Sequence, residues 1–445
     1  MLALRLSLAL FCSLQTQALT LHVPADWPTI PQALQAAQDG DTVLVAPGQH
    51  AGPVDFLGRQ ARVASTDGPM LTTITSAEPG ALVRFIHGEG PGAELEGFTL
   101  SDGTAPEDGG ACGGAIRVED ASPLIRGNII LGNSAVLGGG ACLLGGGARL
   151  EDNLFAQNSA EAGGAVYAQG GAPLIQGNAF QDNQAAGAGY GGALAMESSA
   201  AHVRFNRFTG NTARLGGAIS CRGTGDTEAT FERNSLARNG APIGGGAYFF
   251  LCAPELRTSV LAFATEGAAL WCNQAEPRLA CCDLYANAGG DTLCGLDQGG
   301  NFAADPLFCD LEATDLRLAP GSPCWSSSCG PIGAWNVDCD GVGLAPQPAE
   351  RPSTAVLGLT LWPNPANAEV WLSLEMPVSG PLDLRLYDLR GALAGSCRLP
   401  FLRAGPFRAT LRRLGLNLNA LPGGLYLVRA EAGGISTVGR LLLLP

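Results

Sequence analysis

Residues 113 to 133 contain two phrases that recur along the chain, Gly-Gly-Ala-Ile at 113–116 and Asn-Ile-Ile-Leu-Gly-Asn at 128–133. The first returns as Gly-Gly-Ala followed in most copies by an apolar residue, and the second as two asparagines five residues apart. Successive asparagine pairs begin 25, 25, 28 and 28 residues apart. A recurring motif at a nearly fixed period predicts a solenoid with one repeat in each coil. The glycine phrases lie at 113–116, 139–142, 163–166, 191–194 and 216–219.

Each phrase has an expected place in the coil. Glycine pairs allow the backbone to turn where a side chain would collide, and the apolar residues after them face a narrow core. Asparagine tolerates a left-handed corner, and its amide both donates and accepts hydrogen bonds. Because coils stack about 4.8 Å apart, we expect these amides to form two ladders along the axis. One ladder is predicted through Asn128, Asn153, Asn178, Asn206 and Asn234, the other through Asn133, Asn158, Asn183, Asn211 and Asn239.

Three passages carry a resemblance to known β-helices. The repeats, with Phe-x-x-Asn at 155–158, resemble those of polymorphic outer-membrane proteins and other bacterial β-helix surface proteins. Residues 24–43, with an expected short helix at 32–38, resemble the amino-terminal cap of pectin-lyase-like right-handed parallel β-helices. Residues 305–334 resemble the closing coils of bacterial parallel β-helix proteins. The resemblance implies an all-β, right-handed parallel β-helix over 19–340, with about twelve coils in a rod about 60 Å long.

The start of the chain predicts export. Residues 1–18 combine Arg5, an apolar run at 6–14 and the small residues Thr16 and Ala18, which is typical of a secretory signal peptide. A buried first strand is the alternative interpretation. No later stretch reaches the ~18 apolar residues of a membrane helix. We therefore expect a secreted protein or one on the outer cell surface.

Cysteine usage agrees with an oxidising compartment. Of the 14 cysteines, Cys12 lies in the predicted signal, twelve lie between Cys112 and Cys339, and Cys397 stands alone near the end. Nine of the twelve follow Cys221, where the asparagine repeat fails, so disulfides are predicted to replace the ladder there. Their spacing does not match the usual zinc-ligand sets. Cys397 is expected to be a free buried thiol or an intermolecular one.

The last ninety residues predict a second module. Residues 341–355 form a proline-rich linker, and residues 356–445 alternate apolar and polar residues as a small antiparallel β-sandwich does. They resemble the immunoglobulin-like sorting domain of type IX secretion cargo, which implies the outer-membrane secretion machinery as a partner. A plain adhesion or spacer sandwich is the alternative. The matching residues are Pro363, Asn364, Pro365, Tyr387, Asp388, Gly391, Gly423, Tyr426 and Arg440.

The acidic charge of the chain restricts the classes of partner that it can be expected to bind. Residues 1–355 hold 17 arginines against 35 acidic residues, whereas 356–445 hold 9 against 5, and all 26 basic residues are arginine. A body this acidic disfavours nucleic acid and polyanionic sugars. Neutral or cationic partners remain open, and a glycan or a cell-surface ligand is the expected class of partner. Tyr167, Tyr190, Tyr248 and Trp271 are the aromatic residues expected near a candidate face for sugars.

No catalytic, cofactor-binding or metal-binding residue is assigned. A lyase of the pectate type implies clustered aspartates with an arginine or lysine base, and a glycoside hydrolase needs facing carboxylates. The histidines, at positions 22, 50, 87 and 202, share no rung spacing, and Asp338 and Asp340 only begin a calcium-loop pattern. Glu119, Asp120, Glu151, Asp152 and Glu197 are expected on solvated faces.

Two functions therefore stay open. The favoured one is a non-catalytic exported protein that binds glycan or acts in adhesion, with a C-terminal module for secretion or anchoring. The alternative is a diverged polysaccharide lyase or glycoside hydrolase with a cleft built by the inserts at 101–112, 185–190 and 222–232. The carboxylates in these inserts are Asp102, Glu107, Asp108, Asp226 and Glu228.

Overall fold

The computed structural model describes residues 18–105, 112–223, 229–334 and 339, and then 358–443 with short gaps. The gaps are at 363–369, 377–379, 389–392, 403–404, 417, 419–420, 423 and 433–434. The predicted signal peptide up to residue 17, the linker at 341–355 and Asp340 lie outside the described residues.

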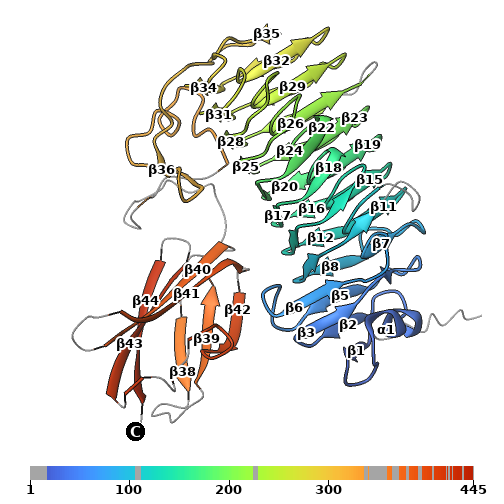
Figure 1. The fold of residues 1–445 in the computed structure, drawn as a ribbon, viewed down its shortest axis with the longest axis vertical. Helices are drawn as coiled ribbons and strands as arrows, with labels where there is room; N and C mark the ends of the chain where they lie inside the picture. Colours follow the sequence, from blue (N-terminus) through green and yellow to red (C-terminus); the bar gives the residue numbers. More distant parts are fainter. Residues whose placement is uncertain are drawn as a thin grey trace, which may run out of the picture.

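The first three hundred residues form a parallel β-solenoid of about ten turns (Figure 1). Three parallel sheets run along it, because each turn contributes one short strand to each sheet. Sheet A is β1 (Thr20–Val23), β2 (Thr42–Val45), β5 (Arg62–Ser65), β8 (Glu94–Glu96), β12 (Leu124–Arg126), β16 (Arg149–Glu151), β20 (Leu174–Gln176), β24 (His202–Arg204), β27 (Thr230–Glu232), β30 (Glu255–Arg257), β33 (Arg278–Ala280) and β35 (Leu296–Asp297).

The other sheets of the solenoid follow the same order. Sheet B is β3 (Gly48–Ala51), β6 (Thr72–Thr75), β9 (Thr99–Ser101), β13 (Ile129–Leu131), β17 (Leu154–Ala156), β21 (Ala179–Gln181), β25 (Arg207–Thr209), β28 (Ser235–Ala237), β31 (Val260–Ala262) and β34 (Asp283–Tyr285). Sheet C is β4 (Val54–Asp55), β7 (Val83–Phe85), β11 (Ile116–Glu119), β15 (Ala141–Leu144), β19 (Val166–Gln169), β23 (Leu194–Glu197), β26 (Ile219–Arg222), β29 (Ala247–Phe250) and β32 (Leu270–Asn273). A small sheet D is β10 (Thr104–Ala105), β14 (Ser134–Ala135), β18 (Ser159–Ala162) and β22 (Gln184–Tyr190).

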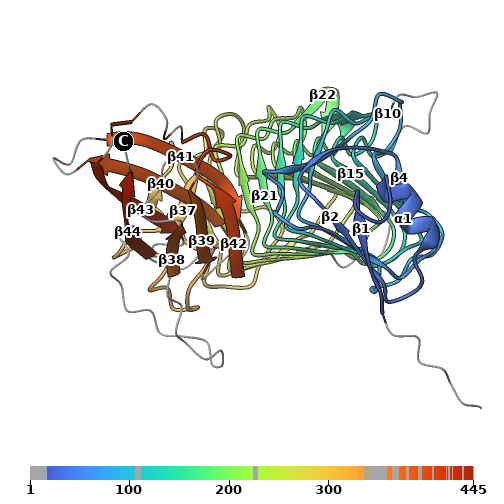
Figure 2. The same ribbon diagram turned by 90° about the horizontal axis from the view of Figure 1, so that it is seen from below.

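A short helix, α1 (Ile30–Ala36), lies at the first end of the solenoid (Figure 2). It begins two residues before the predicted start because the Thr29 side chain accepts a hydrogen bond from the Gln32 N–H and caps the helix. Ile30, Ala33 and Leu34 are buried against the first strands. The helix therefore covers the edge that the first coil would otherwise expose.

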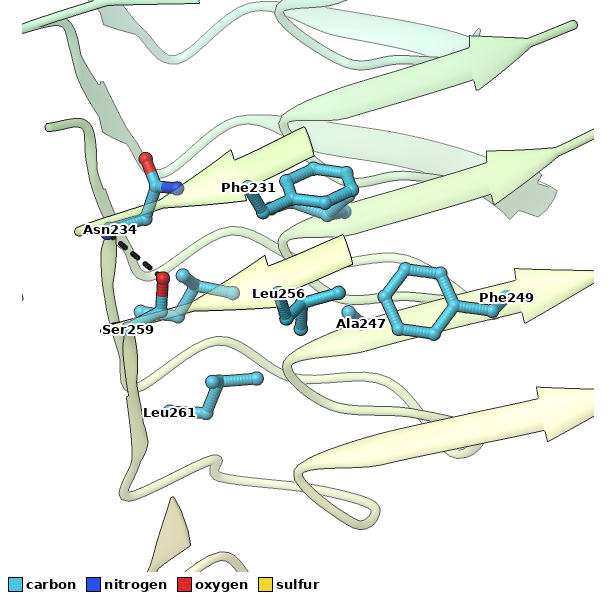
Figure 3. Close-up of a pocket in the computed structure, with 9 residues that line it drawn as sticks. Phe231, Asn234, Ala247, Phe249, Leu256, Ser259 and Leu261 are labelled. Carbon is cyan, nitrogen blue, oxygen red and sulfur yellow. Dashed lines mark hydrogen bonds between the residues drawn. The ribbon is translucent and has the colours of Figure 1, made fainter. Parts of the chain in front are cut away.

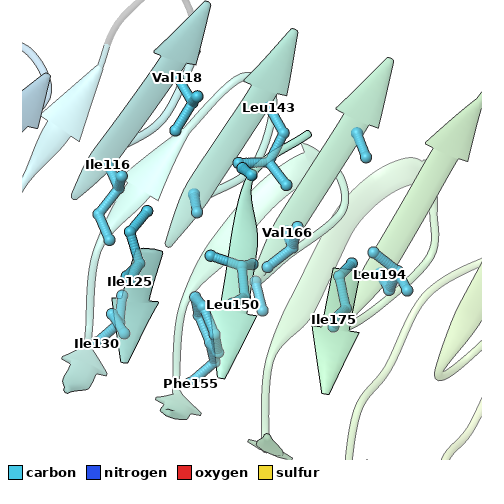
Figure 4. Packing of buried hydrophobic residues seen from close by; sticks show 14 of the residues in the cluster. Ile116, Val118, Ile125, Ile130, Leu143, Leu150, Phe155, Val166, Ile175 and Leu194 are labelled. Carbon is cyan, nitrogen blue, oxygen red and sulfur yellow. The ribbon is translucent and has the colours of Figure 1, made fainter. Parts of the chain in front are cut away.

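Apolar side chains from all three sheets fill the centre of the solenoid (Figure 4). On β11 the buried Ile116 and Val118 alternate with outward residues, as a period of two requires. The rings of Phe155, Phe180 and Phe208 stack on successive turns with centroids 5.1 and 4.7 Å apart. These distances equal the rung spacing, so each phenylalanine packs on the equivalent residue of the next turn. Burying one such side chain stabilises the fold by about 1.5–3 kcal/mol.

Both asparagine ladders are present inside the solenoid. Asn158 accepts hydrogen bonds from the backbone N–H and the amide of Asn133, both at 3.0 Å. Its own amide donates to the Asn183 Oδ1 and to the Ile130 carbonyl, each at 2.9 Å. Equivalent contacts link successive asparagines along each ladder as far as Asn234 and Asn239, and all ten predicted asparagines are at most 1 % exposed. The ladders thus satisfy polar groups at two buried corners of each turn.

The residue that adopts the left-handed conformation at each corner is not the asparagine that was predicted to do so. The asparagine is not left-handed; the residue before it is, as Gln157 (φ 55°) before Asn158 and Phe205 (φ 57°) before Asn206 show. Glycine occupies this position before Asn128, Asn133, Asn178 and Asn211. The asparagine is therefore required for its hydrogen bonds, and the conformational strain falls on its predecessor.

The glycine pairs are required by close backbone contacts. A Cβ on Gly163, where φ is 62°, would lie 2.1 Å from the Val166 oxygen. A Cβ on Gly164 would lie 2.2 Å from the Gly192 oxygen of the next turn. The second glycine is therefore needed for contact between turns, and the first for the turn itself.

Residues 303–334 do not add coils, which corrects the predicted closing coils and the count of twelve turns. They contain an antiparallel hairpin, β36 (Phe308–Asp310) with β37 (Asp315–Leu318), and fold back over the outer face of sheet B. Gln181 donates to Thr314, and the Ala334 N–H donates to Ser235, 99 residues earlier. Apolar burial drives this return, because Leu318, Cys324 and Ile332 pack on Val260 and Ala262.

The C-terminal residues form two antiparallel sheets around one apolar core, as predicted for a small β-sandwich. The described strands of one sheet are β38 (Gly358–Trp362), β39 (Trp371–Met376) and β42 (Gly405–Thr410). Those of the other are β41 (Leu393–Leu402), β40 (Gly380–Asp388), β43 (Gly424–Ala432) and β44 (Ile435–Leu443). Across the described part of the chain, the single helix is far too short to cross a membrane.

Candidate binding face on sheet C

The outer face of sheet C brings together aromatic residues from distant repeats. In β19 the buried Val166 and Ala168 face the core, so Tyr167 points away from it, where it is buried in a second, smaller apolar cluster with Cys142 and Ala162. The strand register then aligns Tyr167 with Ala195, Ser220, Tyr248 and Trp271 on successive turns. A second outward column runs parallel to it. Its members are Gln169, Glu197, Arg222, Phe250 and Asn273.

Glu197 organises the polar part of this face. Its carboxylate accepts hydrogen bonds from the hydroxyl of Tyr167 at 2.8 Å and from that of Tyr190 at 2.7 Å. Arg222 lies 3.6 Å from the same carboxylate. Burial, followed by the bond to Glu197, raises the pKa of Tyr190 to about 12 and that of Tyr167 well above its usual value. Both tyrosines are therefore neutral donors at physiological pH, and the carboxylate is held in place.

The arginine connects this network to the partly exposed ring of Phe250. The Arg222 guanidinium lies 4.4 Å from the centre of the Tyr190 ring and 5.6 Å from that of Phe250. Trp271, on the last strand of the sheet, is 49 % exposed. Asn273 donates to the Tyr248 hydroxyl at 3.3 Å. We call this set the aromatic face; it comprises Tyr167, Tyr190, Glu197, Arg222, Tyr248, Phe250, Trp271 and Asn273.

The opposite end of sheet C is charged. Asp55, Arg84 and Arg117 are aligned in register on β4, β7 and β11. The His87 Nε2 lies 3.4 Å from the Asp55 carboxylate, and Arg117 forms an ion pair with Glu119. The Cys112–Cys142 disulfide lies between the two ends, with Cys142 in the same column as Arg117 and Tyr167. Between these ends the outward-pointing Cys142, Tyr167 and Ala195 are buried in a small apolar cluster, so sheet C presents two separate regions with different chemistries.

The carboxylates singled out from the sequence do not lie together on one face. Glu119 and Glu197 lie on the outer face of sheet C, whereas Glu151 is on sheet A, paired with Arg149. Asp120, Asp152 and Asp102 are left-handed corner residues. Glu107, Asp108, Asp226 and Glu228 lie outside the described residues, as does Asp338.

Sequence reasoning identified four of the aromatic residues but missed their partners. Glu197 was expected on a solvated face, and Arg222 and Phe250 were not singled out. The contact of His87 with Asp55 was also missed, because these early turns lack the repeat phrases that set the register. The 29-residue offset between Asp55 and Arg84 is the signal that would have aligned them. In the described ranges, no three His, Cys, Asp or Glu side chains are placed to hold a metal ion.

Few of the sorting-like residues can be placed. Tyr387 and Asp388 end β40, where they align with Leu427 and Tyr426 of β43. The Tyr426 hydroxyl donates to the Pro422 carbonyl at 2.9 Å, which ties the strand to the preceding turn. Arg440 lies on β44. Pro363, Asn364, Pro365, Gly391 and Gly423 lie outside the described residues, so sorting stays a prediction.

The cavity inside the solenoid is not a second site (Figure 3). Its volume is about 10 Å³, which is the lower limit for one water molecule. Phe231, Phe249 and Leu256 line it, together with Asn234 and Ser259. The Asn234 N–H donates to the Ser259 hydroxyl at 3.1 Å. The cavity arises where serine, which is shorter, takes an asparagine position in the first ladder.

Comparison with known proteins supports the fold. Residues 86–259 match the family model described as a right handed beta helix region. This span contains the five repeats and most of the aromatic face, while Trp271 and Asn273 follow it. No curated protein matches the chain.

Proposed function

We propose that this chain is an exported, non-catalytic protein that binds a neutral polysaccharide along the outer face of sheet C. The observation that carries the proposal is the aromatic face. Phe250 and Trp271 lie on adjacent turns, and the Arg222 guanidinium lies 5.6 Å from the centre of the Phe250 ring, so two apolar rings are available near a fixed charge on Phe250's side. Apolar rings contact the faces of sugar rings, and nearby polar groups bond to sugar hydroxyls.

The position of Glu197 favours binding over hydrolysis. Its register neighbours on adjacent turns are Gln169 and Arg222, and its carboxylate already accepts two tyrosine hydroxyls. A glycoside hydrolase instead needs a second carboxyl group about 5 to 10 Å away on the opposite side of the substrate. Glu197 therefore acts as a fixed acceptor that orients Tyr167, Tyr190 and Arg222.

Charge supports a neutral ligand. The net charge of the whole chain is −14, and the acidic excess lies before residue 356. Such a field repels a polyanionic polymer, so affinity for a uronic-acid chain would need many compensating arginine contacts. Neutral sugars carry no such electrostatic cost.

Export is the second part of the proposal. Four disulfides, Cys112–Cys142, Cys272–Cys294, Cys281–Cys329 and Cys309–Cys339, are typical of an oxidising compartment. The C-terminal sandwich is proposed to direct secretion or anchoring through the outer-membrane secretion machinery. Removal of residues 356–445 should then leave the solenoid in the periplasm when cell fractions are compared. Normal surface delivery of the shortened chain would contradict this part.

The binding experiment uses insoluble neutral glucans, chitosan and polygalacturonate in a pull-down, followed by titration of soluble oligomers. We expect retention on a neutral polymer, with affinity reduced at least about tenfold by Trp271→Ala and by Phe250→Ala, since each removes a central ring contact. Preferential binding to polygalacturonate would overturn the proposal that the ligand is neutral.

Matched controls lie on other surfaces. Trp371 on β39 is 37 % exposed and Phe205 is 36 % exposed, and neither belongs to sheet C. Trp371→Ala and Phe205→Ala should leave retention unchanged. Equal losses in all four variants would show that the rings act through folding and not through contact with the polymer.

A second candidate, a diverged polysaccharide lyase or hydrolase, is favoured by one observation. His87 contacts Asp55 beside the aligned Arg84 and Arg117, a set that combines a proton acceptor with positive charge. The same polymers should therefore be assayed for new reducing ends and for absorbance from unsaturated products. Turnover abolished by His87→Gln would replace the binding proposal with this one.

A further inference from the structure

Two buried thiols on adjacent turns contact each other beneath the aromatic face. Cys221 lies on β26, with its side chain inward and 2 % exposed, and Cys252 follows β29 and is 4 % exposed. The Cys252 Sγ donates to the Cys221 carbonyl at 3.1 Å, and the two thiols are hydrogen-bonded to each other. Leu251, with φ at 53°, turns the chain so that Cys252 enters the core beside Cys221.

The remaining free cysteines have different partners. The Cys282 Sγ donates to the carbonyls of Leu256 and Ala280, and the Cys324 Sγ donates to the Asp283 carboxylate. Cys397 lies in the C-terminal sandwich, on β41. Among the described free cysteines, only Cys221 and Cys252 contact another thiol. Their separation of 31 residues is close to the 30 residues of the Cys112–Cys142 disulfide, which also joins neighbouring turns.

We propose that Cys221 and Cys252 are a thiol–disulfide pair that closes to a fifth disulfide of the solenoid and joins the turns carrying Arg222 and Phe250. The side chains already lie in contact, since the Cys252 Sγ donates to the Cys221 carbonyl at 3.1 Å and interacts with the Cys221 thiol. It is independent of the ligand proposed above. It would join two turns at the point where the first ladder passes from Asn234 to Ser259.

The chemistry requires an external disulfide, such as oxidised glutathione or a protein thiol oxidase. The hydrogen bond with Cys221 holds the pKa of Cys252 below its usual value, whereas the same bond and burial raise the pKa of Cys221. Cys252 therefore attacks the external disulfide as thiolate and releases one thiolate of the donor. Cys221 then loses its proton, attacks the mixed disulfide and releases the second. The protein loses two electrons and two protons, and the donor is reduced to two thiols.

The test is disulfide mapping of the unaltered full chain, which depends on no variant. The reduced, unfolded chain is refolded in a glutathione redox buffer, denatured, alkylated, digested and analysed by mass spectrometry. We expect a linked peptide containing Cys221 and Cys252, with label on Cys282, Cys324 and Cys397. Label on both Cys221 and Cys252, with the other four disulfides closed, would overturn the proposal.

A stability measurement gives a second readout. Closing a loop of about 31 residues is expected to raise the melting temperature by about 5 to 10 °C. Cys221→Ser should therefore melt below the oxidised chain by that amount, and Cys252→Ser should match it. Cys282→Ser is the control for removal of a buried thiol and should keep the linked peptide. Equal melting temperatures of the Cys221→Ser variant and the oxidised wild type would count against the bond.

Discussion

The turns from Asn128 to Asn239 and those from Ser259 to Asn301 share one coil geometry but differ in what holds the turns together. In the first region the two ladders are continuous. In the second, Ser259, Ala264 and Cys282 take ladder positions, as the contacts around them show. Asn287 and Asn301 then resume the pattern, since they accept from the Ala264 and Cys282 backbones.

Other interactions compensate where the ladders are interrupted. Cys272–Cys294 and Cys281–Cys329 cross-link the second region, and residues 303–334 cover its sheet B face. The first region contains one disulfide, Cys112–Cys142, at its edge. The comparison shows that a β-helix can exchange repeated internal hydrogen bonds for a few covalent bonds and an external apolar cover. The predicted replacement of ladder by disulfides is thus only partial, because the ladder also resumes.

The largest expected effect tests the glycine contacts of the first region. In Gly164→Ala the new Cβ would lie 2.2 Å from the Gly192 oxygen and 2.6 Å from Gln184 backbone atoms. The turns would have to separate, so we expect a loss of more than about 4 kcal/mol in the free energy of unfolding. Thermal and urea unfolding measure it. Gly170→Ala is the control, because its Cβ meets nothing within 4 Å and only the positive φ costs about 1 kcal/mol.

The next effect concerns a ladder asparagine. Asn183→Ala removes bonds to the Phe155 carbonyl and to Asn211 and leaves the Asn158 amide unpaired on that side. Buried groups left without partners predict a loss of about 3 kcal/mol. Asn273→Ala, on the outer face of sheet C, should cost less than about 1 kcal/mol in the same urea titration. Similar losses for the two variants would contradict the role given to the ladders.

The third prediction concerns the pH dependence of the free energy of unfolding, to which Asp283 of the second region contributes. Asp283 is 0 % exposed and accepts from the Ala304 N–H and Cys324, and burial raises its pKa to about 6 from 3.8. The folded state therefore holds this proton more tightly than the unfolded state. The contribution of the protonated Asp283 to the free energy of unfolding is fully present below pH 4. As the pH rises through 6 this contribution is lost, and the free energy of unfolding falls by on the order of 3 kcal/mol.

The variant Asp283→Asn should remove this pH dependence. Its unfolding free energy is expected to exceed that of the wild type at pH 7 and to approach it near pH 4. Chemical unfolding at both pH values gives the comparison. If the difference between variant and wild type did not change between them, Asp283 would not be the titrating group.

The smallest effect would make the two regions more alike. Ser259→Asn extends the first ladder by one turn and fills the cavity of about 10 Å³ beside it. One additional buried bond with Asn234 predicts a gain of about 1 kcal/mol in unfolding free energy. Ser326→Asn, in the returning segment, is the control for the same chemical change and should have no such gain.

Much of the fold follows from the sequence because the repeats encode local requirements. Glycine pairs, paired asparagines and alternating apolar residues each determine a position within one turn, and the period stacks the turns. The return of residues 303–334 was missed because it depends on apolar contacts between Ile332 and Val260, which are distant in sequence and have no periodic spacing. The aromatic face was predicted only in part, since the 28-residue repeats obscure which outward residues become neighbours.

The two insertions of three residues leave the ladders in register. One lies between Asn183 and Gly191, where the chain has seven residues in place of the four between Asn158 and Gly163. It forms the end of β22, which bulges from its partner strand, and a Cβ on Gly187 would meet nothing within 4 Å. An insertion within one turn therefore does not shift the ladder asparagines of that turn relative to those of its neighbours. A peptide epitope inserted at Gly187 would therefore be displayed beside Tyr190 without displacing the turns on either side. This corner is a suitable insertion site for presenting peptides on an engineered solenoid.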